Sequence, residues 1–207
     1  MTVVTISAAY GAGGSAIGPL VAEELGVPFV DRAIPVAVAE RLDVSEREAC
    51  ERDESVGSWL SRALLAFGQM GPVLGGAEPV QVAGADEFCA ATEQVLREHA
   101  NAGAVVLGRA GALVLAQHPT ALHVRLTGPL DARIEQAMAL GEADRQTAER
   151  LAEQADRARE AYVRHFYRAD ARDPGHYHLV LDSTALPLPD CAALVVAAAR
   201  ARLPSRG

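Results

Sequence analysis

The first 25 residues constrain the fold more than any other part of the chain. An apolar run over 3–6 leads into a small-residue loop over 8–16, and a helical pattern begins near Ile17. Glycine permits positive φ angles and a close backbone approach, and the N–H groups at the start of a helix favour an anion. A strand, a glycine-rich loop and a helix in this order predict a phosphate-binding loop. The alternative is a tight turn that needs small residues only for packing.

Composition limits the rest of the interpretation. A chain of 207 residues, half of them apolar, suits one domain with a sizeable core. The net charge of -8 argues against a general nucleic-acid or membrane-surface binder. No basic leader and no long uncharged apolar run are present, so we expect a cytoplasmic protein. The widely spaced Cys50, Cys89 and Cys191 show no metal-ligand pattern, and we expect no protein-bound metal cluster. Nothing in the composition indicates an oligomeric state.

Beyond the first helix, apolar strands alternate with helical patterns. Predicted strands cover 27–30, 104–107, 122–126 and 179–181. Helical patterns cover 33–53, 58–67, 86–100, 113–116, 130–139, 142–167 and 190–203, and a glycine- and proline-rich loop covers 68–84. Apolar strands separated by helices are typical of an α/β fold whose parallel sheet is covered on both faces.

Ligands of such folds bind at the carboxyl ends of the strands. Polar or glycine-rich residues follow nearly every predicted strand, and a parallel sheet would gather them at one edge. They are the Gly11 loop, Asp31 and Arg32, Gly108 and Arg109, Thr127, and residues 182–184.

The glycine loop fits two nucleotide-binding patterns. Gly11-x-Gly13-x-x-Ala16 matches the dinucleotide fingerprint, and Asp31 follows Gly11 by 20 residues, where an acid would contact the ribose. A mononucleotide P-loop requires G-x-x-x-x-G-K-[ST], yet the chain contains no lysine. Aligned through the following helix, Gly14 occupies the lysine position and Ser15 follows it. Spacing alone favours the dinucleotide interpretation narrowly.

Four longer stretches reverse that preference. They read ISAAYGAGGSAIGPLVAEELGVPFVDR, VVLGRAGALVL, LHVRLTGPLDARIEQAM and YVRHFYRADARDPGHYHLVLDSTALPL. Together they resemble the cytidylate kinase-like family, a divergent branch of the P-loop nucleoside monophosphate kinases, over nearly the whole chain. The resemblance implies a three-layer P-loop kinase fold with a central parallel sheet of about five strands and a helical lid. It also implies phosphoryl transfer from ATP, with Mg²⁺, to a nucleoside monophosphate such as CMP.

The resemblance also assigns regions and residues within the single domain 1–207. It implies a helical acceptor-side region over 56–101 and a helical lid over 142–176. Gly11, Ala12, Gly13, Gly14, Ser15 and Ala16 match the phosphate loop, where Ser15 would supply a hydroxyl. Arg32 and Arg109 match the arginines that hold the acceptor phosphate, and Asp31 would lie near the acceptor sugar or the magnesium shell. Arg164, Arg168 and Arg172 match lid arginines, one of which would replace the absent lysine.

Two other functions stay open. Without the P-loop lysine, the chain could be a catalytically weak nucleotide-binding or regulatory protein. An NAD(P)-binding reductase is supported by residues 11–31 alone.

Overall fold

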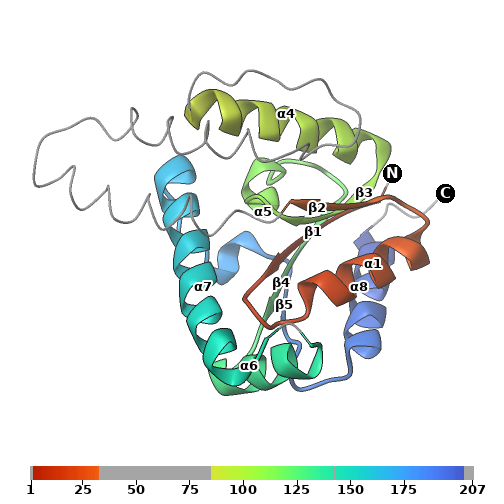
Figure 1. Ribbon diagram of the computed structural model, residues 1–207. Helices are drawn as coiled ribbons and strands as arrows, with labels where there is room; N and C mark the ends of the chain where they lie inside the picture. Colours follow the sequence, from red (N-terminus) through yellow and green to blue (C-terminus); the bar gives the residue numbers. More distant parts are fainter. Residues whose placement is uncertain (1, 33–84, 142, 203–207) are drawn as a thin grey trace, which may run out of the picture.

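A computed structural model describes residues 2–32, 85–141 and 143–202 (Figure 1). The elements predicted over 33–84 lie outside these described residues. The strands are β1 (Val3–Ala8), β2 (Phe29–Arg32), β3 (Ala104–Gly108), β4 (Ala121–Thr127) and β5 (Leu179–Asp182). The helices are α1 (Gly14–Leu25), α4 (Ala85–Ala102), α5 (Gly111–Val114), α6 (Leu130–Ala139), α7 (Arg145–Tyr167), the 3₁₀ helix η1 (Pro174–His176) and α8 (Leu188–Arg202).

The five strands form one sheet in the order β2-β3-β1-β4-β5. Every neighbouring pair is parallel, which confirms the predicted α/β fold with a central parallel sheet of about five strands. All carboxyl ends therefore lie at one edge of the sheet, as the sequence predicted.

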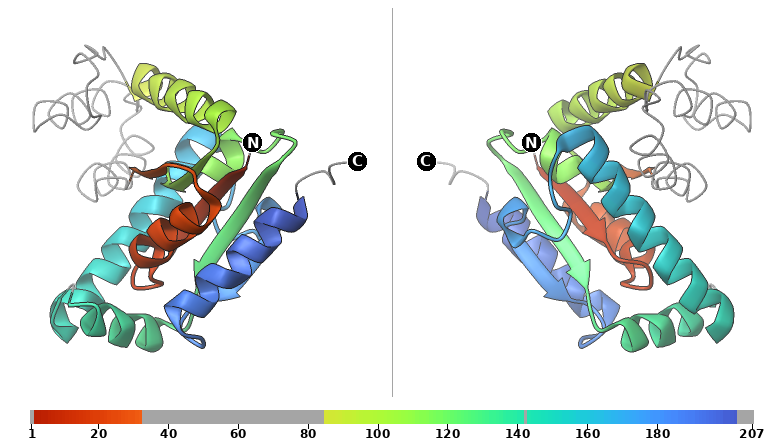
Figure 2. Two further views of the ribbon diagram at one scale, coloured as in Figure 1. Left: turned by 90° about the vertical axis from the view of Figure 1, so that its right-hand side faces the viewer. Right: turned by 90° about the vertical axis from the view of Figure 1, so that its left-hand side faces the viewer.

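Side chains alternate along each strand, so apolar side chains lie on both faces of the sheet and helices cover both. On one face, Val4 and Ile6 of β1 join a buried cluster with Ile17 of α1 and Val195 of α8. On the other face, Val3 packs in a cluster with Leu115, directly after α5. Figure 2 shows α1 and α8 on one side of the strands, with α7 on the opposite side.

Two helices begin at residues that differ from the prediction. Helix α1 begins at Gly14, because Gly13 adopts φ 70° as its N-cap, whereas the sequence pattern begins only near Ile17. The residues of the first turn have small side chains, so this turn shows no apolar periodicity in the sequence. Helix α7 begins at Arg145 rather than at 142, because the Asp144 carboxylate accepts a hydrogen bond from the N–H of Thr147 at 2.8 Å.

Two stacked histidines make the fold sensitive to acid. The rings of His123 and His178 lie 4.8 Å apart, and the backbone N–H of His123 donates to Nδ1 of His178 at 2.9 Å. Burial, with smaller repulsion from His178 and Arg202, lowers the pKa of His123 from 6.5 to about 4. Between these values the unfolded chain binds more protons than the folded chain, so stability is full above pH 6.5 and falls toward pH 4.

We expect this histidine to cost at most about 3 kcal/mol of unfolding free energy between neutral pH and pH 4. Urea unfolding of the wild type and a His123→Phe variant at several pH values measures it. Because phenylalanine cannot be protonated, the variant should show a shallower decline with acid. Equal pH slopes for the two proteins would contradict the assignment.

Candidate functional site

Side chains of other elements bind the carbonyl groups of the loop between β1 and α1. Three side chains, from α6 and from the end of β5, each donate a hydrogen bond to one loop carbonyl oxygen. The pairs are Arg133 Nη1 with Tyr10 (2.7 Å), Gln136 Nε2 with Gly11 (2.9 Å), and Ser183 Oγ with Ala12 (2.7 Å). The N–H of Tyr10 donates to Oδ1 of Asp156 on α7 at 3.0 Å. Segments far apart in the chain thus fix the loop conformation.

Two loop glycines also allow close packing on these elements. Gly11 adopts φ 74°, and a Cβ there would overlap the carbonyl oxygen of Arg133. Gly13 adopts φ 70°, and a Cβ there would lie 2.8 Å from Cδ2 of Leu188. Packing therefore accounts for these two glycines, whether or not the loop also binds phosphate.

Gly14 explains in steric terms why no lysine stands at this point of the loop. A Cβ at Gly14 would lie 2.6 Å from Cβ of Ala8 and 3.0 Å from Cδ1 of Leu107. A side chain there would require Ala8 or Leu107 to shift. Any positive charge for a bound phosphate must therefore come from another element.

A cavity of about 290 Å³, which we call the loop cavity, opens at the carboxyl ends of β1, β2 and β3. It brings together several of the predicted site residues: Gly11, Gly13, Gly14, Ser15, Asp31 and Arg109. Ala12 and Ala16 do not line it. Arg32 ends β2 opposite Gly108 of β3, but its side chain lies outside the described part of the chain.

Arg109 reaches the loop cavity through an unusual turn. Gly108, Arg109 and Ala110 adopt φ angles of 80°, 52° and 51° between β3 and α5. A non-glycine residue in this left-handed region costs about 1–3 kcal/mol, and such strain clusters at functional sites. Arg109 is only 5% exposed, so its guanidinium is largely withdrawn from water.

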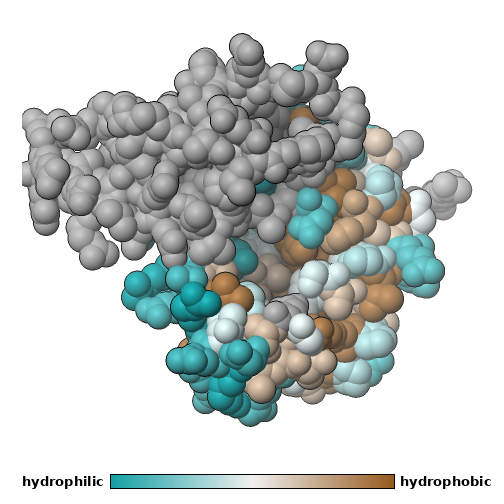
Figure 3. All heavy atoms as spheres, viewed as in Figure 1, coloured by the Kyte–Doolittle hydropathy of each residue, from teal (hydrophilic) through white to brown (hydrophobic). Residues whose placement is uncertain are grey.

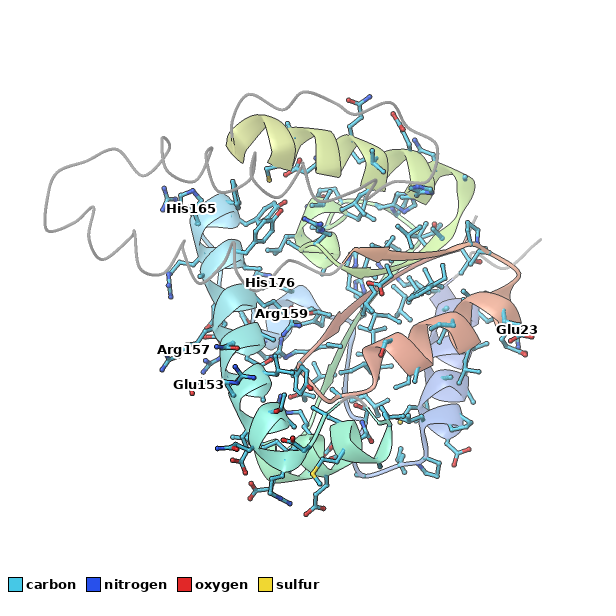
Figure 4. All side chains as sticks on the ribbon, in the orientation of Figure 1. Glu23, Glu153, Arg157, Arg159, His165 and His176 are labelled. Atoms are coloured by element: carbon cyan, nitrogen blue, oxygen red, sulfur yellow. The ribbon has the colours of Figure 1, made fainter. Side chains whose placement is uncertain are left out.

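Arg159, which was not among the site residues predicted from the sequence, also lines the loop cavity. Figure 4 shows Arg159 extending from α7 toward the sheet, whereas Arg157 and Glu153 lie on the outer side of the helix. Nη1 of Arg159 lies 3.0 Å from Oδ1 of Asp156, the carboxylate that also binds the N–H of Tyr10. Burial lowers the pKa of Arg159, and Asp156 partly opposes that effect. Asp156 therefore positions a cation beside the loop.

A signal for Arg159 was present in the sequence. Helix α7 is mostly polar, but a stripe of small or apolar residues recurs at helical spacing, with Ala148, Ala152 and Val163 all buried. Arg159 follows Ala152 by seven positions and precedes Val163 by four, so it falls on the same inward face. An arginine on the buried stripe of an otherwise solvated helix indicates a specific role.

The three predicted lid arginines lie in different surroundings. Arg164 is exposed on α7, and Arg168 is the exposed, left-handed C-cap of that helix at φ 52°. Neither lines the loop cavity or the second cavity described next. Arg172 is exposed and its Nε donates to Oε1 of Glu160 at 2.6 Å, a contact that raises the pKa of Arg172.

A second cavity, also of about 290 Å³, lies beside the first. We call it the arginine cavity, since Arg125, Arg133, Arg159 and Arg172 line it together with Thr127, Asp156 and Glu160. The two cavities share Ala9, Arg159 and Ala171.

The strand order argues against the dinucleotide interpretation of the loop. In the dinucleotide-binding fold the second strand lies directly beside the first, which brings its terminal acid to the ribose. Here β3 lies between β2 and β1. Neighbouring strands are about 4.8 Å apart, so Asp31 is displaced by one strand width from that position.

The visible surface of the described residues differs in polarity between the α7 side and the α1 side. In Figure 3 hydrophilic residues gather over the visible part of α7, while more hydrophobic residues lie on the α1 side. Among residues 2–32, 85–141 and 143–202, no helix has the length and apolar character required to span a bilayer. In the same described ranges, no cluster of three or more histidine, cysteine or acidic side chains is arranged for a metal ion.

Several solved structures match the chain. A crystal structure of an uncharacterized protein from Eubacterium ventriosum ATCC 27560 matches with a TM-score of 0.61 at 16% identity, covering 97% of this chain and 99% of that one. Shikimate kinase from Acinetobacter baumannii in complex with shikimate gives a TM-score of 0.49 at 14% identity, with 97% and 94% covered. A gluconokinase from Sinorhizobium meliloti 1021 gives 0.46 at 15% identity, with 97% and 92% covered.

Sequence comparison identifies the family. No curated protein matches the chain. The profile described as cytidylate kinase-like family matches residues 3–185. This range contains the glycine loop, all five strands and both cavities, which confirms the resemblance found in the sequence and gives the protein a kinase-like P-loop fold. The chain belongs to the cytidylate kinase-like family.

Proposed function

We propose that this protein transfers a phosphoryl group from ATP to a small acceptor, with a nucleoside monophosphate such as CMP as the first candidate. The observation that carries the proposal is the loop cavity, where a fixed glycine loop, Arg109 and Arg159 line one space. Phosphoryl transfer depends on positioning and on positive charge around the transferring group. Two arginines from separate elements beside the loop supply both requirements.

The backbone of the loop supports binding of the ATP phosphates. Gly14 and Ser15 are the first residues of α1, so their N–H groups have no acceptor within the helix. The first full helical hydrogen bond runs from the N–H of Ile17 to the carbonyl oxygen of Gly13 at 2.8 Å. These N–H groups and the helix dipole favour a bound phosphate. Since a side chain at Gly14 would require Ala8 or Leu107 to shift, we assign to Arg159 the charge that a P-loop lysine provides elsewhere.

The side chains present are compatible with Mg²⁺ bound together with ATP. In kinase sites Mg²⁺ keeps several waters and takes only one or two carboxylates besides the substrate phosphates. Asp31 and the exposed Ser15 both line the loop cavity and supply one carboxylate and one hydroxyl. When bound, the ion would neutralise charge on the phosphates. Asp31 would orient its water shell or the acceptor sugar, and Arg109 would hold the acceptor phosphate.

The region around α7 is proposed as a lid over 142–176, and 56–101 as the acceptor-side region. Within the lid, Arg159 faces the cavity, and Arg164 and Arg168 remain candidates for contacts made on closure. The predicted cytoplasmic location belongs to the same proposal.

Calorimetry with ATP and Mg²⁺, CMP and NADH, followed by coupled ADP release over a panel of acceptors, tests this function. We expect ATP and one monophosphate to bind, and ADP to be released only when both are present. Binding of NADH without binding of ATP would refute the proposal.

A second function is favoured by one observation, the close approach of Ala8 and Leu107 to the position that a side chain at Gly14 would take. A family member that cannot place a lysine in its loop could bind a nucleotide without transferring its phosphate. ATP binding without transfer to any acceptor would support this regulatory function.

The role of Arg109 can be tested separately. Replacing a charged partner of a phosphate costs about 1.5–3 kcal/mol, so Arg109→Gln should weaken CMP binding about tenfold or more while the fold persists. Calorimetric titration with CMP measures the affinity, and the circular dichroism spectrum checks the fold. Arg200→Gln is the matched control, because that side chain is 58% exposed on α8, pairs with Glu24 at 3.1 Å and lines neither cavity. Unchanged CMP affinity in Arg109→Gln would remove Arg109 from the site.

A further inference from the structure

The arginine cavity contains more positive charge than its carboxylates neutralise. Two of its arginines share one partner, since Asp156 lies 2.9 Å from Nη1 of Arg133 and 3.0 Å from Nη1 of Arg159. A third, Arg172, pairs with Glu160. Four arginines and two carboxylates leave an excess of two positive charges among the lining residues.

Arg125 is the arginine without a carboxylate. Its Nη1 donates to the carbonyl oxygen of Ala171 at 2.7 Å, and its guanidinium carbon lies 5.7 Å from the ring centroid of Tyr177. In the described part of the chain it forms no ion pair. A carbonyl and an aromatic ring stabilise a cation but do not neutralise it.

Part of this excess charge is withdrawn from water. The Arg133 side chain is only 10% exposed, and burial disfavours the charged form of Arg159. Desolvated positive charge without a counter-charge costs free energy, which an anion in the cavity would offset. The excess is local, because the whole chain carries a net charge of -8.

We propose that the arginine cavity binds a phosphoryl group in addition to any phosphate held by the glycine loop. Guanidinium groups bind phosphate oxygens in bidentate fashion, and the Thr127 side chain at the wall offers a further donor. The cavity of about 290 Å³ is large enough to admit a phosphate group.

The proposed site is distinct from the loop cavity but connected to it. Arg125 and Arg172 line only the arginine cavity, whereas Arg159 lines both. Substitutions of Arg125 and Arg172 therefore test the new site without removing a side chain from the loop cavity. The proposal concerns anion binding, so it does not require phosphoryl transfer.

Calorimetry with inorganic phosphate at constant ionic strength is the test. We expect the wild type to bind two phosphates, and Arg125→Gln and Arg172→Gln each to lose one or to bind it at least fivefold more weakly. Arg157→Gln is the matched control, because it removes the same charge from the outer face of α7, where the side chain is 68% exposed. It should bind phosphate like the wild type.

The side chain of Arg172 is 66% exposed, so this variant keeps the test valid if Arg125→Gln fails to fold. Unchanged phosphate affinity and stoichiometry in every folded variant would overturn the proposal. So would loss of affinity in Arg157→Gln equal to that in Arg172→Gln, because it would reflect net charge alone.

A titration of phosphate in the presence of saturating ATP distinguishes the sources of the group. If ATP displaces both phosphates, the cavity holds part of the ATP phosphate chain. If one phosphate binds together with ATP, the cavity takes free phosphate or a phosphate of the acceptor. Both results support the site. Failure of phosphoryl transfer would contradict only the proposed function and leave these titrations unaffected.

Discussion

Arg159→Gln should lower kcat/KM for ATP-dependent transfer by about 10²–10³, the usual cost of removing one preorganised group that stabilises transition-state charge. The physical reason is that Gly14 carries no side chain, so the loop itself supplies no lysine charge. Arg159 and Arg109 line the loop cavity and supply positive charge in its place. Asp156 holds Arg159 at 3.0 Å and also binds the N–H of Tyr10, so the cation and the loop are positioned together. Coupled ADP release measures the rate, and ATP titration separates binding from transfer.

Two further variants make the Arg159 experiment specific. Arg157→Gln, on the outer face of the same helix, should retain full activity (Figure 4). Arg159→Lys should recover part of the loss, because it keeps the charge but not the planar fork. Equal activity of Arg159→Gln and Arg157→Gln would show that the charge comes from elsewhere, with Arg164 and Arg168 as the next candidates.

The fold was largely predictable because its signals are local. Each strand of the sheet contains apolar residues in a run or at alternate positions and has a glycine or polar residue at or shortly after its end. The parallel arrangement follows from the intervening helices. Strand order was not predictable, since it depends on pairings between distant segments. That order, with β3 between β2 and β1, is what separates the kinase-like sheet from the dinucleotide-binding one.

The site was predictable where it follows a strand and not where it lies on a helix. Gly11 lies shortly after β1, Asp31 lies near the end of β2 and Arg109 directly follows β3, and the topology gathers them in the loop cavity. Arg159 lies in the middle of a long polar helix among other arginines, so only its place on the buried stripe distinguishes it. The anchors of the loop, Arg133 and Asp156, were invisible for a different reason: their contacts with Tyr10 join residues more than 120 positions apart.

Gly11→Ala should destabilise the protein by roughly 3 kcal/mol or more, the sum of a strained positive φ and an overpacked contact. Gly11 adopts φ 74°, and a new Cβ would overlap the backbone carbonyl of Arg133. A backbone atom cannot rotate away as a side chain can, so either the loop or the start of α6 must move. Urea unfolding measures the loss of stability, and calorimetry should show weakened ATP binding because the carbonyl contacts of the loop are disturbed.

Gly26→Ala separates the two contributions to this effect. Gly26 also has a positive φ, 65°, but no atom lies within 4 Å of the position that its Cβ would take. It should therefore show only the backbone strain, about 1 kcal/mol, and unchanged ATP binding. The difference between the two variants measures the packing of the loop on α6. A loss in Gly11→Ala no greater than in Gly26→Ala would mean that the loop yields easily, and a loop that yields could not hold phosphate in the preorganised geometry on which the proposed transfer depends.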